Sequence, residues 1–423
     1  MTVGVRNLTW GAVLLLLSGC APANPRPDAP MPADEPGREA AELHARCSAV
    51  GEEEAMGCYD AGLQATMHER GIPAAMSVLG RLSEMDTEIR REGHMYAHSL
   101  GLSAYSGADS VSSTFRQCLP TFQSGCYHGV IQGYFAEMAG SDGANGLSEQ
   151  VVNDLCQDYR DSSEGDWLLF QCVHGMGHGL SQVSNHDLKR TLAGCDLLHS
   201  GWEREGCYGG AFMENIMEAV APHHAVGRPG ETMDHAAMGH AGMDHSGMDA
   251  APAAAPKLID PADPLYPCSA LAEKYLHACY QMQTSAMLQL NGGDIPAAAR
   301  TCDQVALAHR AECYQSLGRD VSAYTLQDFQ RAATLCSSGD PLFQPWCHVG
   351  FVKNVIDLGA DYRQGVAYCR SLVGVEVKKA CYRAVGEEIA SLTADDTRRA
   401  AACDDAEWAF RDTCGRAAGL RKQ

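Results

Sequence analysis

The spacing of the cysteines is the feature that most limits how this chain can fold. All but one of the 19 cysteines fall into nine consecutive pairs, and the members of five pairs lie eleven positions apart. Within one helix, residues eleven apart are about 16 Å from each other, whereas disulfide-bonded Cα atoms lie roughly 4.4 to 6.8 Å apart. The chain must therefore fold back between the two cysteines, so each pair is predicted to staple a hairpin. The predicted disulfides are Cys47–Cys58, Cys118–Cys126, Cys156–Cys172, Cys195–Cys207, Cys268–Cys279, Cys302–Cys313, Cys336–Cys347, Cys369–Cys381 and Cys403–Cys414.

The second cysteine of each pair also marks an internal repeat. In the carboxy-terminal part these cysteines stand at positions 279, 313, 347, 381 and 414, which are separated by 34, 34, 34 and 33 residues. The same interval leads from Cys58 through Glu92 to Cys126, so a repeat without cysteines is expected around Glu92. Segments such as "LQDFQRAATLC" and "WCHVGFVKNVIDLG" have helical patterns. The sequence thus predicts an all-α fold, an α-solenoid of about ten helical hairpins with a period near 34.

A period near 34 with helical segments resembles tetratricopeptide-like hairpin repeats, in particular exported versions stapled by disulfides. The resemblance covers about residues 41–423 but lacks the usual Trp/Leu/Gly/Tyr consensus, so it implies the architecture and not the family. A tyrosine follows the second cysteine in six pairs, and we expect these rings to pack structurally against the disulfides. The six are Tyr59, Tyr127, Tyr208, Tyr280, Tyr314 and Tyr382.

The amino-terminal sequence predicts the cellular compartment in which the protein resides. Arg6 precedes an apolar stretch at 11–17 that is too short to span a bilayer, and small residues then precede Cys20, as in a secretory signal. The "LSGC" at 17–20 resembles the bacterial lipobox, which implies that residues 1–19 are removed and Cys20 is lipidated; ordinary secretion is the alternative. The remaining 18 cysteines are an even number, which suits an oxidising compartment. We therefore expect a lipid-anchored protein of the cell envelope that faces the periplasm or the cell exterior.

Composition and cysteine spacing divide the chain after residue 19 into four predicted segments. Residues 20–40 contain six prolines and are expected to form an extended stalk, or a disordered tail. Helical repeats are predicted over 41–218 and over 263–423. Between them lies a predicted disordered insertion at 219–262, because Cys207 and Cys279 are 72 positions apart instead of about 34. The net charge of −21 argues against nucleic acid as a partner and favours metal ions or other cations.

The insertion contains the segment "MDHAAMGHAGMDHSGM" at 233–248, which has no apolar period that could pack on a core. Paired thiols cannot bind metals, but thioethers select Cu(I), and imidazoles accept Cu(II) and zinc. The segment also resembles Met/His-rich stretches of periplasmic copper-resistance proteins, which implies copper capture; an inert linker is the alternative. The expected ligands are Met233, His235, Met238, His240, Met243, His245 and Met248.

A second candidate metal site comes from the repeat register. We number each repeat from the second cysteine of its pair, or from Glu92 in the repeat without cysteines. Positions two and six residues after that residue share one helical face. They carry five histidines in three consecutive repeats, whereas the next repeat has Gly209 and Met213. Packed helices lie about 8 to 10 Å apart, so imidazoles from neighbouring repeats can meet at one or two ions. The predicted ligands are His94, His98, His128, His174, His178 and Met213, whereas the first position in later repeats holds Gln281, Gln315, Val349 and Arg383.

Glycines crowd the helices that carry the histidines, although glycine in a helix costs about 1 kcal/mol relative to alanine. They stand at positions 93, 129, 133, 175, 177 and 179 and predict either close helix approach or room for a ligand beside the imidazoles. The expected metal is copper, with zinc as the alternative.

The sequence is compatible with three functions. The first is an envelope lipoprotein that binds copper for sequestration, resistance or delivery. The second is a helical-repeat scaffold that holds an envelope protein in its groove. The third and least favoured is a His-ligated metalloenzyme, because no Glu or Asp stands in an obvious general-base position.

Overall fold

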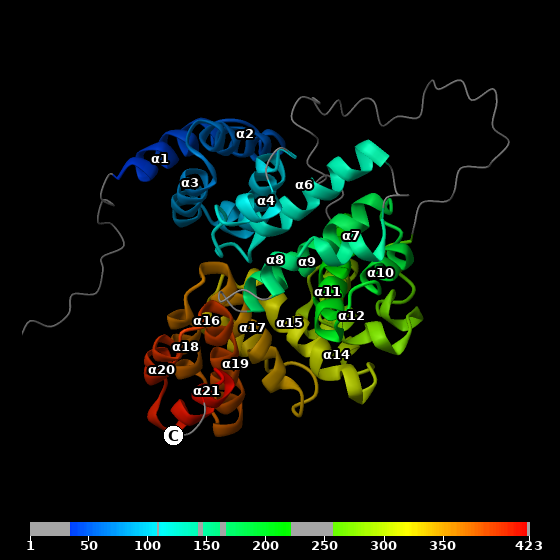
Figure 1. Ribbon diagram of the computed structural model, residues 1–423. Helices are drawn as coiled ribbons and strands as arrows, with labels where there is room; N and C mark the ends of the chain where they lie inside the picture. Colours follow the sequence, from blue (N-terminus) through cyan, green and yellow to red (C-terminus); the bar gives the residue numbers. More distant parts are fainter. Residues whose placement is uncertain (1–33, 108–109, 143–146, 161–165, 221–256, 421–423) are drawn as a thin grey trace, which may run out of the picture.

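The structure is a computed structural model that describes residues 34–107, 110–142, 147–160, 166–220 and 257–420. This part of the chain folds into helices and contains no strand, as the sequence predicts. Ten helical hairpins follow one another in chain order and pack as a solenoid (Figure 1). Across the same residues, none of the helices combines the length and the hydropathy that a membrane span requires.

The second helices of the hairpins, here named the B helices, pack on one another along the array. The B helices are α2 (Glu52–Arg70), α4 (Thr87–Ala104), α6 (Gly125–Asp142), α9 (Asp166–Val183), α11 (Gly201–Val220), α13 (Gln283–Asn291), α15 (Arg310–Tyr324), α17 (Gln344–Gly359), α19 (Val375–Leu392) and α21 (Arg411–Ala417). The first helices are α1 (Glu35–Cys47), α3 (Ile72–Met85), α5 (Val111–Phe115), α7 (Glu149–Asp154) with α8 (Gln157–Arg160), α10 (Leu188–Cys195), α14 (Ile295–Cys302), α16 (Phe329–Leu335), α18 (Tyr362–Ser371) and α20 (Asp396–Asp404). In the sixth hairpin, 3-10 turns take the place of the first helix, and α12 (Leu276–Tyr280) precedes α13.

Aspartate caps start many of the first helices. The side chains of Asp294, Asp328 and Asp361 each accept a hydrogen bond from a backbone N–H in the first turn of the helix that follows. Such a cap satisfies a donor that the helix itself leaves unpaired. Because these aspartates recur at the repeat interval, the sequence sets the start of these hairpins locally.

The nine predicted disulfides are all present, and each closes one hairpin. Their Cα–Cα distances run from 5.4 to 5.9 Å, within the range of unstrained bridges. The six tyrosines that follow the second cysteines are buried. Several of their hydroxyls reach back toward the first cysteine: Tyr127 donates to the carbonyl of Cys118, and Tyr314 donates to Asp303, the residue after Cys302. The structural role predicted for these rings agrees with these contacts.

Two segment boundaries differ from those predicted. Helix α1 begins at Glu35, inside the stretch expected to be a stalk, because Asp34 caps it and Pro36 fits in its first turn, where no N–H is needed. At the insertion, α11 extends to Val220, and the carbonyl of Leu258 accepts a hydrogen bond from Asn215, so both ends of 219–262 belong to the array. The Met/His segment and Cys20 lie outside the described residues.

Glycines allow neighbouring B helices to touch backbone to backbone. A Cβ atom would lie 2.0 Å from the carbonyl oxygen of His98 at Gly129, and 1.9 Å from that of His174 at Gly210. Contacts of the same kind occur far from any histidine cluster, as at Gly318 of α15, where a Cβ would lie 1.9 Å from the carbonyl oxygen of Cys347. Of the two explanations left open by the sequence, close helix approach is therefore the one that applies to most of these glycines.

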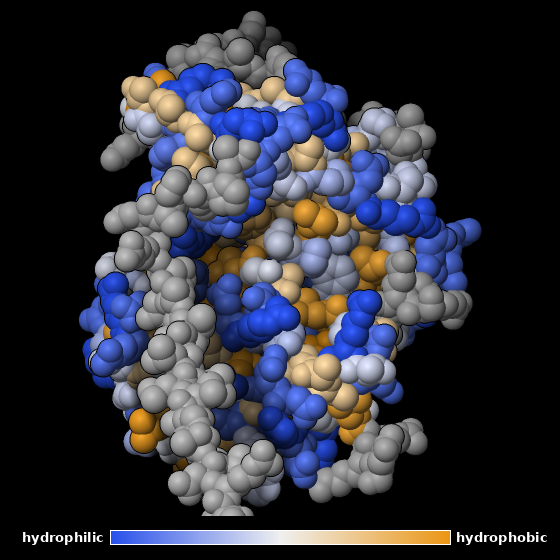
Figure 2. All heavy atoms as spheres, turned by 90° about the vertical axis from the view of Figure 1, so that its left-hand side faces the viewer, coloured by the Kyte–Doolittle hydropathy of each residue, from blue (hydrophilic) through white to orange (hydrophobic). Residues whose placement is uncertain are grey.

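One face of the solenoid is hollowed between polar rims (Figure 2). Figure 2 shows this face, where hydrophobic atoms are visible in a central depression between hydrophilic rims. The apolar core runs through every hairpin, with Leu63, Phe135, Phe212 and Phe351 among its fully buried members.

Replacing Gly318 with alanine should destabilise the protein by about 2 kcal/mol or more, because the added methyl group overlaps the backbone of α17. Gly57→Ala in α2 is the matched control, since a Cβ there meets nothing within 4 Å, and it should stabilise the chain by up to about 1 kcal/mol. Guanidinium denaturation followed by circular dichroism measures both. Equal effects of the two substitutions would contradict backbone contact between B helices.

Candidate metal centre

The five histidines of the repeat register lie together in the structure. They come from three successive B helices, α4, α6 and α9. The ring centroids of His128 and His174 are 4.7 Å apart, and those of His128 and His178 are 5.2 Å apart. His94 and His98 complete the group, 5.5 Å from His128 and 5.7 Å from His178 respectively. Four of the rings are buried, and His94 is half-buried.

Three of the imidazoles are placed as ligands of one ion could be. His128, His174 and His178 each offer a ring nitrogen, and these nitrogens lie within 4.8 Å of one another. Ions such as zinc bond imidazole nitrogens at about 2.0 to 2.1 Å, so small adjustments of the side chains bring three nitrogens onto one ion. The described residues therefore contain a candidate three-nitrogen site.

Oxygen acceptors hold one ring nitrogen on several of these histidines. His178 Nδ1 is 2.7 Å from Glu214 Oε2, and His128 Nε2 is 3.1 Å from Gln171 Oε1. His94 Nδ1 is 3.0 Å from the carbonyl oxygen of Phe122. Because these oxygens accept, each of the three nitrogens carries the proton and donates. The other nitrogen of each ring then keeps its lone pair, which is what a metal ligand needs.

Four other ring nitrogens of the cluster are buried and have no hydrogen-bond partner among the residues that the structure describes. This applies to His98 Nε2, His128 Nδ1, His174 Nδ1 and His178 Nε2. A buried polar atom without a partner costs about 1 to 3 kcal/mol, and native proteins contain few of them. Four in one cluster are difficult to reconcile with packing alone. A metal ion that accepts their lone pairs would remove this cost.

The cluster is electrically neutral on its imidazoles at neutral pH. Burial lowers the pKa of all five histidines, and it lowers the pKa of His98 and of His178 to about 3. Repulsion between the rings acts in the same direction, since a charge on one ring disfavours a charge on the next. The lone pairs are therefore available for coordination without prior loss of a proton.

Glu214 is a member of the site that the sequence interpretation missed. It projects from α11 to His178, and burial raises the pKa of its carboxyl group. It stands seven positions after Cys207, beyond the two register positions that were compared. Asp320 and Glu388 occupy the same position after Cys313 and Cys381, so a recurring acid there was the available signal. Met213, the residue before Glu214, is half-buried, and its role as a ligand stays a prediction.

Gly209 keeps space beside the cluster. It occupies the position that carries a histidine in the three preceding repeats, and a Cβ there would lie 3.3 Å from His174 Nδ1. Any larger side chain would therefore fill the space next to His174 Nδ1, which has no hydrogen-bond partner within the described ranges. This one glycine fits the explanation that small residues leave room beside the imidazoles.

A turn at residues 122–124 connects the cluster to the carboxy-terminal repeats. All three residues have left-handed backbone angles, with φ between 51° and 60°. The N–H groups of Phe122 and Gln123 donate to the carbonyls of Leu358 and Asp357, at 2.9 and 3.2 Å. These carbonyls lie in the last turn of α17, where a helix leaves its acceptors unpaired. The amide of Gln123 also donates to the side chain of Asn354.

This turn positions His94. The carbonyl of Phe122 accepts the hydrogen bond from His94 Nδ1, and the Phe122 ring covers Gly93, where a Cβ would lie 2.4 Å from the ring. The acceptor that orients one imidazole is thus held by a helix more than two hundred residues away in the chain. Both halves of the solenoid contribute to the site.

The edge of the cluster nearest the surface is aromatic. The ring of Phe170 lies 5.6 Å from that of His174 and 6.0 Å from that of Trp202. Phe170 and Trp202 are 38% and 48% exposed, which is high for such large apolar side chains.

Comparison with protein-family profiles, characterised proteins and solved structures found no match to the chain. The function of the cluster must therefore be inferred from its own chemistry.

Acid should destabilise the metal-free protein between about pH 6.5 and pH 3. Burial keeps the pKa of His98 and of His178 at about 3 in the folded state, whereas unfolded histidine has a pKa of about 6.5. Below pH 6.5 the unfolded chain binds protons that the folded cluster does not bind. Stability is therefore fully present above that pH and is lost as the pH falls, by up to about 1.4 kcal/mol per pH unit for each histidine.

Denaturation midpoints of metal-stripped protein, taken from about pH 7.5 down to about pH 4.5, measure this loss. The variant His98→Gln/His178→Gln should show a shallower decline than the wild type. If both proteins lose stability in parallel, the buried imidazoles are not the cause.

Proposed function

We propose that this chain is a cell-envelope lipoprotein that binds a transition-metal ion in its five-histidine cluster and serves in copper sequestration, resistance or delivery. One observation carries the proposal: four buried imidazole nitrogens lack hydrogen-bond partners in the described part of the chain. In two of these rings, His128 and His178, an oxygen acceptor holds the opposite nitrogen. This is the arrangement that orients histidines toward a metal.

The ligand chemistry supports copper and leaves zinc as the alternative. Imidazole nitrogens suit both ions, and the general order of affinities for divalent metals places copper above zinc. The Met/His segment at 233–248 would add thioethers, which favour Cu(I). Three imidazoles beside an open position also match the ligand set of many zinc sites.

Each part of the cluster has a defined task in this proposal. The B helices fix the spacing of the imidazoles, and burial keeps water and protons away from their nitrogens. Glu214 accepts the hydrogen bond from His178 Nδ1, which fixes the tautomer of that ring and increases the basicity of Nε2. The Met/His segment would collect ions that the preorganised cluster then holds more tightly.

The location in the envelope rests on two features. The "LSGC" motif at 17–20 implies a lipid anchor at Cys20. The nine disulfides of the described chain fit an oxidising compartment, where such bonds persist. With every remaining thiol paired, imidazoles, thioethers and carboxylates are the ligands that the chain can offer.

A metalloenzyme is the second candidate, and Glu214 is the observation that favours it. A carboxyl group with a raised pKa beside a metal site can carry protons during a reaction. Glu214→Gln distinguishes the two functions. Metal storage should survive this substitution with reduced affinity, whereas proton transfer at the site would be abolished.

The proposed function predicts a tightly bound ion that depends on the cluster. Protein exported in a bacterial host should carry one such ion by elemental analysis, and His128→Gln/His174→Gln should lose it. His348→Gln is the matched control, because His348 is also buried but hydrogen-bonds Tyr368 in α18 and lies outside the cluster. Deleting residues 223–256 should remove only weakly bound copper. A double variant that keeps the tight ion would rule the cluster out.

The turn at 122–124 should tune the affinity of the site. Gln123→Ala/Asn354→Ala removes the side-chain contact between the turn and α17 and so loosens the acceptor of His94. Affinity for the ion should fall about ten- to a hundredfold, while saturation still reaches the wild-type stoichiometry. Competition with a chelator of known affinity measures the change, and Gln330→Ala on the exposed face of α16 serves as control. An unchanged affinity would show that the carboxy-terminal repeats do not support the site.

A further inference from the structure

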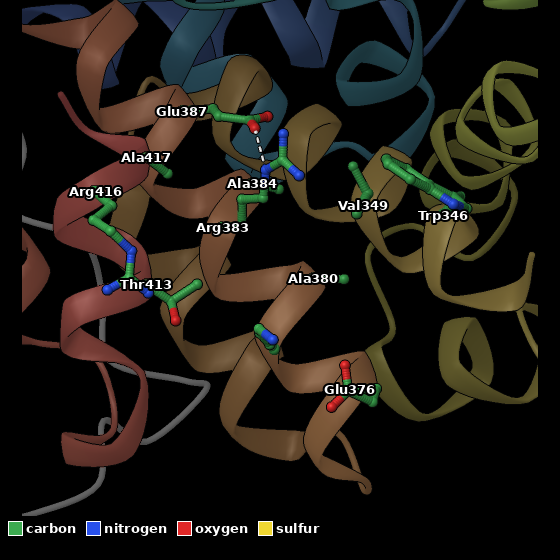
Figure 3. A pocket seen from close by; sticks show the side chains of 11 residues that line it. Trp346, Val349, Glu376, Ala380, Arg383, Ala384, Glu387, Thr413, Arg416 and Ala417 are labelled. Carbon is green, nitrogen blue, oxygen red and sulfur yellow. Dashed lines mark hydrogen bonds and ion pairs between the residues drawn. The ribbon is translucent and has the colours of Figure 1, made fainter.

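A groove on the carboxy-terminal repeats gathers cations in a chain with a net charge of −21 (Figure 3). It lies across α17, α19 and α21 and encloses about 600 Å³. Lys379, Arg383 and Arg416 line it together with Trp346 and Thr413. Volumes of roughly 300 to 1,000 Å³ are typical of small-molecule sites.

The groove occupies the same face of the B helices as the histidine cluster. Arg383 and Arg416 stand two positions after Cys381 and Cys414, which is the register position of His128 and His174. The array thus presents neutral imidazoles near one end and guanidinium groups near the other. The floor of the groove is made of small or apolar side chains, among them Ala380, Ala384, Ala417 and Val349.

Among the residues that the structure describes, only one of the three cations has a carboxylate partner. Arg383 pairs with Glu387 at 3.0 Å, and Lys353 approaches the same carboxylate at 2.9 Å. Within the part of the chain that the structure describes, Lys379 and Arg416 form no ion pair, and both side chains are exposed. Glu376 is the other acid of the lining. The groove therefore retains positive charge that an anion could neutralise.

The two walls of the groove differ in chemistry. Figure 3 shows Arg416 and Thr413 on the α21 side and Trp346 on the opposite side, with the alanines of α19 between them. Guanidinium and hydroxyl groups bind carboxylate or phosphate oxygens, whereas an indole and alanine methyl groups contact hydrocarbon. A ligand that satisfies both walls has a charged end and an apolar end.

We propose that this groove binds a single-chain amphipathic anion, with a carboxylate or phosphate head between Lys379 and Arg416 and an apolar chain along α19 toward Trp346. The same head chemistry is found in free small acids and in membrane lipids. This binding is independent of the metal site.

Isothermal titration of the full, metal-loaded chain with decanoate tests the site. Decanoate should bind, whereas decyltrimethylammonium, which has a similar tail and the opposite charge, should not. Inorganic phosphate alone should bind at least about tenfold more weakly, because it lacks the apolar part. Equal binding of the two decyl compounds would overturn the proposal, since the cations would then play no part.

Two variants assign the binding to the groove. Lys379→Gln/Arg416→Gln should lower the affinity for decanoate at least about tenfold, and Ala380→Leu should lower it by filling the floor. The control Lys189→Gln/Arg190→Gln makes the same change of charge on exposed residues of α10 and should bind as the wild type does. If the control loses as much affinity as the groove variant, net charge and not the groove is responsible.

Vesicles distinguish the source of the anion. Phosphatidylglycerol vesicles should retain the wild-type chain more than the groove variant if a lipid head is the ligand. If decanoate binds but vesicles retain both proteins equally, the ligand is a free acid. If neither probe depends on Lys379 and Arg416, the groove is not a ligand site.

Discussion

Backbone contact between neighbouring B helices is the constraint on which the site depends. At Gly129 and Gly210 the space for a side chain is already taken by the carbonyl groups of His98 and His174. When helices approach this closely, histidines at equivalent positions of neighbouring repeats are near enough for their imidazole rings to meet. A disulfide also closes nine of the ten hairpins, those of α6 and α9 among them, whereas the hairpin of α3 and α4 has none. Wider helix spacing would leave the same histidines as separate side chains.

The periodic features could be predicted from the sequence because they are local. Disulfides that close about a dozen residues, aspartate caps and glycine contacts repeat at the interval of the hairpins, so one register describes them all. The same register identified all five histidines, since two positions on a helix four residues apart share a face. The hairpin array and the meeting of the imidazoles are therefore encoded over short stretches of chain.

Other parts of the site depend on curvature, which the repeat interval does not encode. The turn at 122–124 meets the end of α17 only because the solenoid brings the third and eighth hairpins together. Glu214 follows Met213, which occupies the position equivalent to the second histidine of the earlier repeats. The angle between α9 and α11 decides which of these two residues reaches His178. The start of α1 was also missed, because Pro36 is compatible with a stalk and with the first turn of a helix. The Met/His segment follows no register at all.

The most direct test of the metal centre is an experimental structure of the protein as exported, with anomalous scattering recorded at the copper and zinc edges. The account predicts a peak bonded at about 2.0 to 2.1 Å to His128 Nδ1, His174 Nδ1 and His178 Nε2, with Glu214 on the far nitrogen of His178. No peak, together with water molecules or ring-to-ring hydrogen bonds at these nitrogens, would contradict it.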